Sequence, residues 1–237
     1  MEKWTIAAEK MLDITLSQNQ QEQFRIYEEL LLDWNSKINL TAVRDPEGIR
    51  IKHFLDSLTC VPALGDMNVK SLIDIGTGAG FPGIPLRIFY PEMKLTLVDS
   101  VGKKADFCRL VCDTLHLKNV TVLKDRSEEL GANKNTREKF DAATARAVAI
   151  LPVLCEYLLP LVKVGGVMLA QKGEGAPVEV KTAAAAIQKL GGGEPELTEI
   201  TLPEVEGPRY LVKIPKIKAT PAGYPRRTGL PLKKPIS

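Results

Sequence analysis

The chain has 237 residues, with 44% hydrophobic residues, 26% charged residues and a formal net charge of +3. These ordinary values exclude a disordered protein, and no apolar run reaches the ~18 residues that a membrane span requires. The N-terminus lacks a basic stretch followed by an apolar core, so we expect no signal peptide and a cytoplasmic protein. Four cysteines without Cys-x-x-Cys spacing and two histidines argue against a metal site.

The first part of the chain predicts helices. Ser17 and Gln20 form a capping box, and apolar residues from Phe24 to Trp34 recur every three or four positions. The pair Asp45-Pro46 is typical of a helix start, because aspartate caps a helix and proline suits its first position. The sequence therefore predicts an N-terminal helical segment over residues 1–62.

From about residue 70 the chain alternates between short apolar runs and helical patterns, which predicts a parallel sheet covered by helices. The expected strands are residues 71–75, 94–99, 120–123, 140–144 and 166–170, with helical patterns at 103–116, 147–160 and 177–190. Two further runs, 196–202 and 209–214, lie too close for a crossover helix, so they should pair antiparallel at one edge. We expect an α/β fold over residues 63–218, with a Rossmann-like, mostly parallel seven-stranded sheet.

A glycine-rich turn, Asp74-Ile75-Gly76-Thr77-Gly78-Ala79-Gly80-Phe81-Pro82-Gly83, follows the first expected strand. Glycines there let the backbone approach a ligand closely, at the sheet edge where α/β folds bind ligands. Asp99 ends the second strand, 23 residues after Gly76, and a carboxylate at that place can accept hydrogen bonds from both ribose hydroxyls. The pattern predicts a cofactor that contains a nucleoside.

Two cofactor classes fit this turn. The spacing Gly78-x-Gly80-x-x-Gly83 matches the dinucleotide pattern, although it begins two residues after the turn has started. Asp74 favours S-adenosylmethionine, because a carboxylate repels a pyrophosphate and attracts the ammonium of a methionyl group. The late antiparallel pair is also more typical of methyltransferases. We favour a class I S-adenosylmethionine-dependent methyltransferase, with a dinucleotide enzyme and a non-catalytic fold as alternatives.

The pattern thus assigns cofactor contacts to Asp74, Gly76, Thr77, Gly78, Gly80 and Asp99. Two of them have simpler alternative roles. Asp99 could cap the following helix, and Asp74 could be an ordinary charge at a strand end.

The charge is unevenly distributed along the chain. Residues 207–237 hold eight of the 32 basic residues and no acidic residue, which leaves 24 basic against 29 acidic residues elsewhere. Such a segment is typical of a surface that binds a polyanion, and a solubilising tail is the alternative. It contains six prolines, four of them within residues 219–237, which predicts that these last residues form a stiff, poorly helical, basic tail.

Several stretches across most of the chain resemble one family. They are Trp34-Asn35 through Asn39-Leu40-Thr41, His53–Leu58, Asp74–Pro85, Val98-Asp99-Ser100, Lys103-Lys104, Thr144–Val148, Ala170–Gly173, and Tyr210–Val212 through Thr220-Pro221 and Tyr224–Arg226. The runs DIGTGAGFPG and TARAVA together are far more specific than a lone glycine pattern. On these motifs the chain resembles the RsmG (GidB) family of bacterial 16S rRNA guanine-N7 methyltransferases.

The resemblance implies a cytoplasmic enzyme that uses S-adenosyl-L-methionine to methylate N7 of one guanine of 16S rRNA near the decoding site. It implies cofactor contacts at Gly76, Phe81, Ser127, Glu128 and Arg146. Ser100, next to Asp99 in a matching stretch, is a further candidate cofactor contact. Serine at 127 departs from the family's usual alanine, and we expect it to keep the backbone contact to adenine. Arg146 is also the candidate catalytic residue, which would orient the cofactor or the guanine. The alternatives are a structural ion pair for Arg146 and a solvated helix-start residue for Glu128.

The implied partner is 16S rRNA or the small ribosomal subunit, with no DNA and no membrane, and a monomer is expected. Basic residues neutralise phosphates, and an aromatic ring stacks on a base. The expected RNA contacts are Lys103, Lys104, Arg209, Lys213, Lys216, Lys218, Tyr224, Arg226 and Arg227.

Guanine N7 carries a lone pair and no proton, so its methylation needs no general base and depends on alignment and water exclusion. This suits a chain in which His53 is expected to be structural or RNA-facing and His116 a surface residue. Thr144–Ala147 stands where amine methyltransferases carry Asp/Asn-Pro-Pro-Tyr/Phe, and no Pro-Cys pair supplies a thiol for carbon-5 chemistry. A small-molecule methyltransferase and a non-catalytic RNA-binding or ribosome-assembly factor remain as alternatives.

Overall fold

The computed structural model describes residues 2–65 and 69–237, so Met1 of the expected helical segment and residues 66–68 of the expected methyltransferase domain lie outside the described residues. A seven-stranded sheet runs in the order β3-β2-β1-β4-β5-β7-β6. The strands are β1 (Ser71–Ile75), β2 (Lys94–Val98), β3 (Val120–Leu123), β4 (Phe140–Arg146), β5 (Val162–Lys172), β6 (Glu196–Ile200) and β7 (Arg209–Pro215). Strands β1 to β5 are parallel, whereas β7 is antiparallel to both β5 and β6. The expected α/β class and its antiparallel edge hairpin are confirmed.

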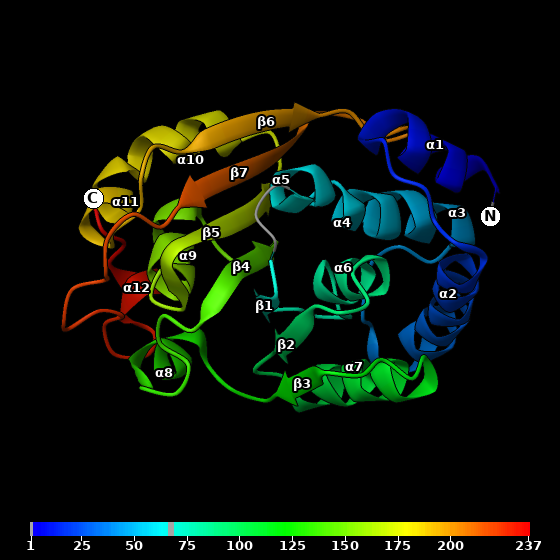
Figure 1. The fold of residues 1–237 in the computed structure, drawn as a ribbon, viewed down its shortest axis with the longest axis horizontal. Helices are drawn as coiled ribbons and strands as arrows, with labels where there is room; N and C mark the ends of the chain where they lie inside the picture. The colour runs from blue at the N-terminus through cyan, green and yellow to red at the C-terminus, as the bar shows by residue number, and fades with distance from the viewer. Residues whose placement is uncertain (1, 66–68) are drawn as a thin grey trace.

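Helices cover both faces of the sheet, because parallel strands joined by crossovers bury both faces (Figure 1). One layer contains α1 (Glu2–Leu12), α2 (Gln18–Ile38), α3 (Pro46–Ile49), the π-helix η1 (Arg50–Leu55), α4 (Asp56–Leu58), α5 (Val61–Gly65), α6 (Gly83–Phe89) and α7 (Gly102–Thr114). The other contains α8 (Ser127–Ala132), α9 (Leu151–Leu158), α10 (Ala176–Thr182), α11 (Ala184–Lys189) and α12 (Leu230–Lys233). Strand side chains alternate between the layers, so Leu72 packs in the first and Ile73 in the second.

The N-terminal helices share a hydrophobic core with the sheet. Phe24 and Tyr27 of α2 are fully buried in the same cluster as Leu72 of β1. Helix α2 starts with the expected capping box, because Gln20 N–H donates to the Ser17 hydroxyl and Ser17 N–H donates to the Gln20 side chain. The aromatic stripe of this segment is therefore core, and its helices form one wall of the α/β unit.

The helix that begins at Pro46 changes geometry after about one turn. The Gly48 N–H donates to Asp45 Oδ1 at 2.7 Å, as the Asp-Pro pair predicted. The chain then continues through the π-helix η1 into α4. A π-turn inserts one extra residue into a helix and is frequent at functional sites. Here the segment places His53 and Asp56 against the carboxyl end of β4.

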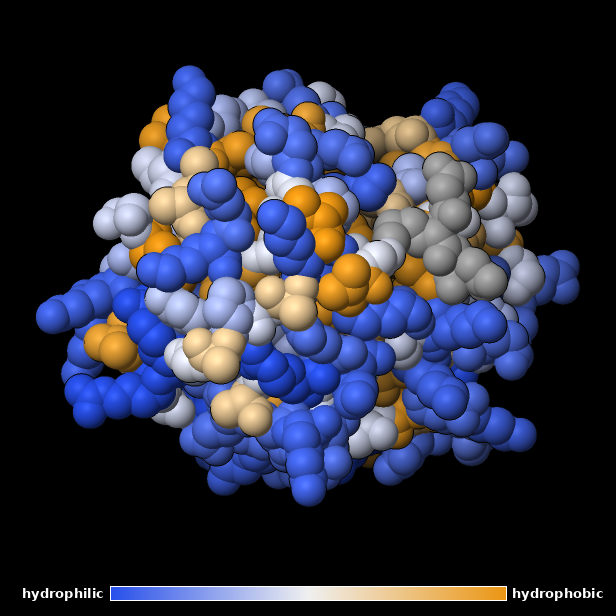
Figure 2. Space-filling model, turned by 60° about the vertical axis from the view of Figure 1, so that its left-hand side comes forward, coloured by the Kyte–Doolittle hydropathy of each residue, from blue (hydrophilic) through white to orange (hydrophobic). Residues whose placement is uncertain are grey.

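The tail, residues 219–237, returns along the outside of the second helical layer. Strand β7 ends beside the start of β5, at the amino edge of the sheet. The tail then contacts α9 through Arg226 and Glu156, and α8 through Gly229 and Glu128. Helix α8 starts at the carboxyl edge, so the tail crosses from one edge of the sheet to the other. Figure 2, which turns this side forward, shows a mostly hydrophilic surface with separate apolar patches.

None of the helices formed by residues 2–65 and 69–237 combines the length and the apolar character needed to span a membrane. In the same ranges, no three His, Cys, Asp or Glu side chains come together as a group that could hold a metal ion. All four cysteines are buried free thiols.

Candidate active site

Polar side chains form a row along the carboxyl edge of the sheet. Asp99 follows β2, Asp74 lies near the end of β1, and Arg146 ends β4. Gln171 of β5 stands beside Arg146, because the two residues are register partners. The strand order reverses at β1: β2 and β3 lie on one side of it, and β4 and β5 lie on the other. Ligands of α/β folds bind at the strand ends beside such a reversal.

Asp74 has no exposed surface. Its Oδ2 accepts hydrogen bonds from the Thr77 hydroxyl at 2.6 Å and the Gly83 N–H at 2.9 Å, which hold the glycine-rich turn. Its Oδ1 has no hydrogen-bond partner among the described residues, and neither has the hydroxyl of Thr144, its register partner. Burial raises the pKa of Asp74 from 3.8 to about 7, although both hydrogen bonds oppose the shift. Such buried, unpaired oxygens call for a ligand, an ion or water.

The turn itself leaves a concave stretch of backbone beside Asp99. Gly76 has a φ of +66°, and a Cβ there would lie 2.5 Å from a methyl group of Val148. The Gly78 N–H donates to Asp99 Oδ2 at 2.9 Å, and the Val101 N–H donates to Oδ1 at 2.8 Å. Only glycine therefore fits at position 76, and the turn is fixed before any ligand arrives.

A cavity of about 210 Å³, which we call the Asp99 cavity, opens beside the turn. Five expected cofactor residues line it: Gly76, Asp99, Ser100, Ser127 and Glu128. Its apolar walls are Ile75, Val98, Val148, Tyr157 and Leu232. Thr77 and Phe81 are buried behind the turn instead, and Gly80 is packed against Tyr27 and Ile84. The loops after β2 and β3 therefore meet at this cavity. Thr77, Gly80 and Phe81 of the glycine motif pack inside the protein instead and support the turn.

These features fit S-adenosylmethionine. Asp99 keeps free acceptor capacity for ribose hydroxyls, because a carboxylate has about four lone-pair sites. The apolar walls suit an adenine ring. Asp74 does not line this cavity and has no exposed surface, so an ammonium group would need water or a movement of the turn to reach its unpaired Oδ1. A pyrophosphate in this cavity would instead lie against the carboxylates of Asp99, Asp125 and Glu128, which repel it. The dinucleotide alternative therefore fits this site poorly.

Arg146 links the end of β4 to the π-helix. Its guanidinium donates to Asp56 Oδ2 at 2.7 Å, and its centre lies 4.9 Å from the centroid of the Phe81 ring. The structural ion pair that was the alternative role for Arg146 is therefore present. His53 stacks on Phe81 with ring centroids 4.6 Å apart. Burial, together with the charge of Arg146, lowers the pKa of His53 from 6.5 to about 3, so His53 is neutral and a weak base near neutral pH.

A second cavity of about 240 Å³, which we call the Gln171 cavity, opens beside Arg146. Its walls include Asp56, Arg146, Ala147, Gln171, Lys172 and Arg209. Gln171 Nε2 donates to the Asp56 carbonyl at 2.5 Å, which fixes the orientation of the amide because a carbonyl only accepts. The buried Oε1 of Gln171 has no partner within the described residues. Carboxylates of Asp56, Glu174 and Glu179 also line the cavity, and two of them pair with Arg146 and Lys172. This cavity therefore combines paired charges and the cation of Arg209 with an unused acceptor.

The two cavities share a thin wall. Ala147 lines the Gln171 cavity, and the next residue, Val148, lines the Asp99 cavity. Ala147 has a φ of +56°, a conformation that costs energy for a residue with a Cβ and that concentrates at functional sites. Groups bound in the two cavities would lie side by side across this strained residue.

Asp56 and Gln171 are site residues that the sequence reasoning did not assign. Both lie in stretches that carried the resemblance, His53–Leu58 and Ala170–Gly173. Neither stretch has a spacing that reveals a shared cavity, because the two side chains meet only through the fold.

The structure places some of the expected RNA contacts near the carboxyl edge of the sheet and the others away from it. Lys103 and Lys104 start α7, Arg209 lines the Gln171 cavity, and Arg227 is exposed in the tail. These four lie toward the carboxyl edge or on the tail segment that leads to it. Lys213 pairs with Glu196 at 3.2 Å, and Lys218 is exposed beyond the end of β7.

Lys216 is wrong as an RNA contact. It is only 1% exposed, and its Nζ donates to the carbonyls of Leu159 and Leu190 at 2.8 and 2.9 Å. Burial lowers its pKa from 10.5 to about 8.

Arg226 and Tyr224 also have roles within the protein. The Arg226 guanidinium binds the buried Glu156 carboxylate at 2.6 Å. The Tyr224 ring lies under the Lys189 ammonium at 5.5 Å and packs against the second core cluster. The structure therefore corrects the expectation that these two side chains are presented to RNA, because both anchor the tail.

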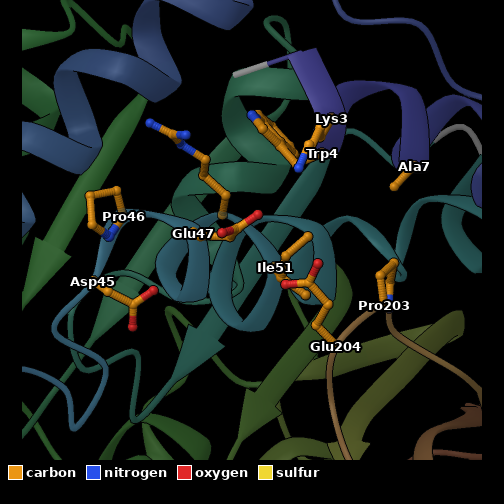
Figure 3. Close-up of a pocket in the computed structure, with 10 residues that line it drawn as sticks. Lys3, Trp4, Ala7, Asp45, Pro46, Glu47, Ile51, Pro203 and Glu204 are labelled. Carbon is orange, nitrogen blue, oxygen red and sulfur yellow. The ribbon is translucent and has the colours of Figure 1, made fainter.

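A wider cavity of about 870 Å³ lies apart from this edge, among α1, α3, η1 and the loop after β6 (Figure 3). The carboxylates of Asp45, Glu47 and Glu204 line it, against the one free ammonium of Lys3 within the lining. Arg50 also lines it but is paired with a glutamate at 2.6 Å. This acidic cavity would repel an RNA backbone.

The fold and the Asp99 cavity define the class: a class I S-adenosylmethionine-dependent methyltransferase. Solved structures agree on the fold. The O-methyltransferase from Bacillus cereus in complex with S-adenosylhomocysteine has a TM-score of 0.58 at 18% identity, covering 91% of this chain and 99% of that chain. TrmN from Thermus thermophilus has a TM-score of 0.54 at 14% identity, covering 69% and 49%.

The chain belongs to the GidB family, described as rRNA small subunit methyltransferase G, whose sequence model matches residues 20–204. Its relatives include proteins named Ribosomal RNA small subunit methyltransferase G from Alkaliphilus metalliredigens, Desulforamulus reducens and a Roseiflexus species. They are 47%, 45% and 50% identical to it, over 95%, 97% and 94% of this chain. The matches cover 94%, 96% and 94% of those relatives. The resemblance inferred from the motifs is confirmed.

Proposed function

We propose that this enzyme transfers a methyl group from S-adenosylmethionine to N7 of one guanine in 16S rRNA of the small ribosomal subunit, near the decoding site. The observation that carries the proposal is the pair of cavities on either side of Ala147 and Val148. The names and the high identity of the relatives support the rRNA substrate. An enzyme with this substrate acts in the cytoplasm.

The Asp99 cavity holds the cofactor in this proposal. Asp99 binds the ribose hydroxyls, and Asp74 receives the ammonium group, directly or through water. Bound S-adenosylmethionine supplies an electrophilic methyl group on a sulfonium. The carboxylates and the apolar walls keep this cation in one orientation and exclude water from it.

The Gln171 cavity receives the guanine. The unpaired Gln171 Oε1 can accept a hydrogen bond from an N–H of the guanine, and Arg146 or Arg209 can donate to O6. Transfer requires direct contact between N7 and the sulfonium methyl, so N7 would have to lie at the rim of the Ala147–Val148 wall and face the Asp99 cavity. N7 loses no proton on methylation, which agrees with the low pKa of about 3 for the neighbouring His53.

RNA phosphates would bind around the mouths of the two cavities. Lys103 and Lys104 flank the Asp99 side, Arg209 flanks the Gln171 side, and Arg227 lies on the tail. Such contacts make binding steeply dependent on salt, which a small-molecule methyltransferase would not show.

The test is incubation of the purified protein and S-adenosylmethionine with small subunits that lack the modification. Borohydride and aniline cleavage, followed by primer extension, maps 7-methylguanine. We expect one new stop near the decoding site, and none without the cofactor. Cofactor binding without any stop on subunits, precursor particles or free 16S rRNA would contradict the proposal and favour a non-catalytic assembly factor.

A further inference from the structure

Leu232 is an apolar side chain at the mouth of the Asp99 cavity. It lines this cavity together with Val148 and Tyr157, yet it is 58% exposed. Its partial exposure leaves an apolar surface that a flat, apolar ligand could cover. Removing such surface from water stabilises a complex by roughly 25 cal/mol per Å².

The tail is anchored along its length, so the position of Leu232 is built into the fold. Arg137, in the segment before β4, donates to the Thr220 carbonyl at 2.7 Å. Further along, Arg226 pairs at 2.6 Å with Glu156, whose side chain is only 1% exposed. Breaking a buried pair of this kind is costly, which means that the tail is held against α9.

The last anchor lies at the cavity itself. The Gly229 N–H donates to Glu128 Oε1 at 2.9 Å, and Glu128 lines the Asp99 cavity. Helix α12 starts at the next residue and carries Leu232. The same bond therefore orients an expected cofactor residue and holds the tail over the cavity.

The position of Leu232 along the cavity indicates which part of a ligand it meets. Asp99 after β2 marks the place suited to the ribose. Ser127 and Glu128 follow β3, the next strand outward, and Glu128 binds the tail. A ligand whose ribose binds Asp99 would therefore place its base at this outer end.

We propose that the tail forms the outer wall of the Asp99 cavity and that Leu232 packs against the adenine ring of bound S-adenosylmethionine. The inference rests on the proposed function in one respect, the occupancy of the Asp99 cavity by this cofactor. It changes the expected role of the tail, because variants there alter cofactor affinity as well as any RNA contact. Leu232 is thus a cofactor-binding residue that lies 104 positions after Glu128 in the chain.

The test is calorimetry of S-adenosylhomocysteine binding to the full-length protein. Leu232→Ser should weaken binding about tenfold, the effect of losing one apolar side-chain contact. Leu232→Met should bind within about twofold of the wild type, because it keeps the apolar surface. Ile217→Ser is the matched control. Ile217 is similarly exposed, at 54%, but it follows the last residue of β7 at the amino edge of the sheet, away from the Asp99 cavity. Its replacement should leave the affinity for S-adenosylhomocysteine unchanged.

Hydrogen exchange supplies an independent measurement. Bound S-adenosylhomocysteine should slow amide exchange over residues 228–234 in the wild type and much less in Leu232→Ser. Wild-type affinity in Leu232→Ser, with tail exchange indifferent to the ligand, would overturn the inference and leave the proposed function standing. Tight ligand binding without methylation of any rRNA substrate would instead overturn the proposed function and leave the role of Leu232 intact.

Discussion

The Asp99 cavity and the Gln171 cavity lie on either side of Ala147 and Val148, but they are built in different ways. The first is framed by backbone: a glycine-rich turn whose N–H groups bind the Asp74 and Asp99 carboxylates. The second is framed by long side chains from distant parts of the chain. Its Arg146–Asp56 pair and its Gln171–Asp56 bond join residues 90 and 115 positions apart.

This difference suits two kinds of ligand. A turn that is fixed by its own backbone presents the same surface whatever surrounds it, which fits an invariant cofactor. A cavity made of charged and amide side chains reads hydrogen-bond donors and acceptors, which fits the edge of a base. Changes on one side of the Ala147–Val148 wall should therefore leave the other side largely unaffected.

The largest expected effect is the loss of cofactor binding in Asp99→Ala. The substitution removes the proposed ribose ligand and frees the Gly78 and Val101 N–H groups that Asp99 now holds. We expect S-adenosylhomocysteine affinity to fall at least ~100-fold, equivalent to about 2.8 kcal/mol. Calorimetry measures it, and circular dichroism checks that the variant is folded.

Asp125→Ala is the matched control, because Asp125 lines the same cavity but binds neither Gly78 nor Val101. Its affinity should fall by less than ~10-fold. Wild-type affinity in Asp99→Ala would remove Asp99 from the cofactor site and leave it as a residue that only holds the turn.

Arg146→Ala should break the Gln171 cavity alone. It leaves Asp56, with a side chain only 9% exposed, without its ion-pair partner, so we expect a loss of about 3 kcal/mol in unfolding free energy. Methylation of small subunits should fall steeply, while S-adenosylhomocysteine binds within about threefold of the wild type. Denaturant unfolding, calorimetry and single-turnover methylation separate these effects.

The double variant Asp56→Ala with Arg146→Ala sharpens this test. Removing both charges should recover most of the stability, since no buried charge remains unpaired, but should not recover methylation. A tenfold loss of cofactor affinity in the single variant would contradict the division between the cavities and return Arg146 to the cofactor site that the resemblance implied.

The sequence indicated the residues of the Asp99 cavity but not Asp56 and Gln171 of the Gln171 cavity. The reason is that a contiguous motif forms much of the first cavity, whereas residues distant in the chain form the second. The strand–turn–helix around Gly76 is contiguous, so composition and spacing expose it, and Asp99 follows at the end of the next strand. Asp56 and Gln171 meet only when α4 packs on β5, and no local pattern encodes that contact. The tail was misassigned in part because charge suggested phosphate contacts, whereas Lys216 and Arg226 satisfy partners inside the protein.

The smallest expected effect concerns pH. Burial gives Asp74 a pKa of about 7, so the cofactor-free protein holds this carboxylate mostly protonated at pH 6 and mostly charged at pH 7.5. The charged form attracts the cofactor ammonium, and S-adenosylhomocysteine affinity should therefore rise several-fold between these two pH values.

Asp74→Asn should abolish this rise, because it keeps an acceptor for Thr77 and Gly83 but has no charge to lose.

The same carboxyl group should make the cofactor-free protein less stable as pH rises, whereas it makes cofactor binding tighter. Its folded pKa lies above the ordinary 3.8, so the folded state holds the proton more tightly and stability falls as pH rises from about 4 through 7. Thermal unfolding of the cofactor-free protein should show that fall in the wild type and a smaller one in Asp74→Asn. An equal pH dependence in both proteins would mean that the buried Asp74 has an ordinary pKa. Asp74 would then be charged at both pH values and could not cause a rise in S-adenosylhomocysteine affinity between pH 6 and pH 7.5.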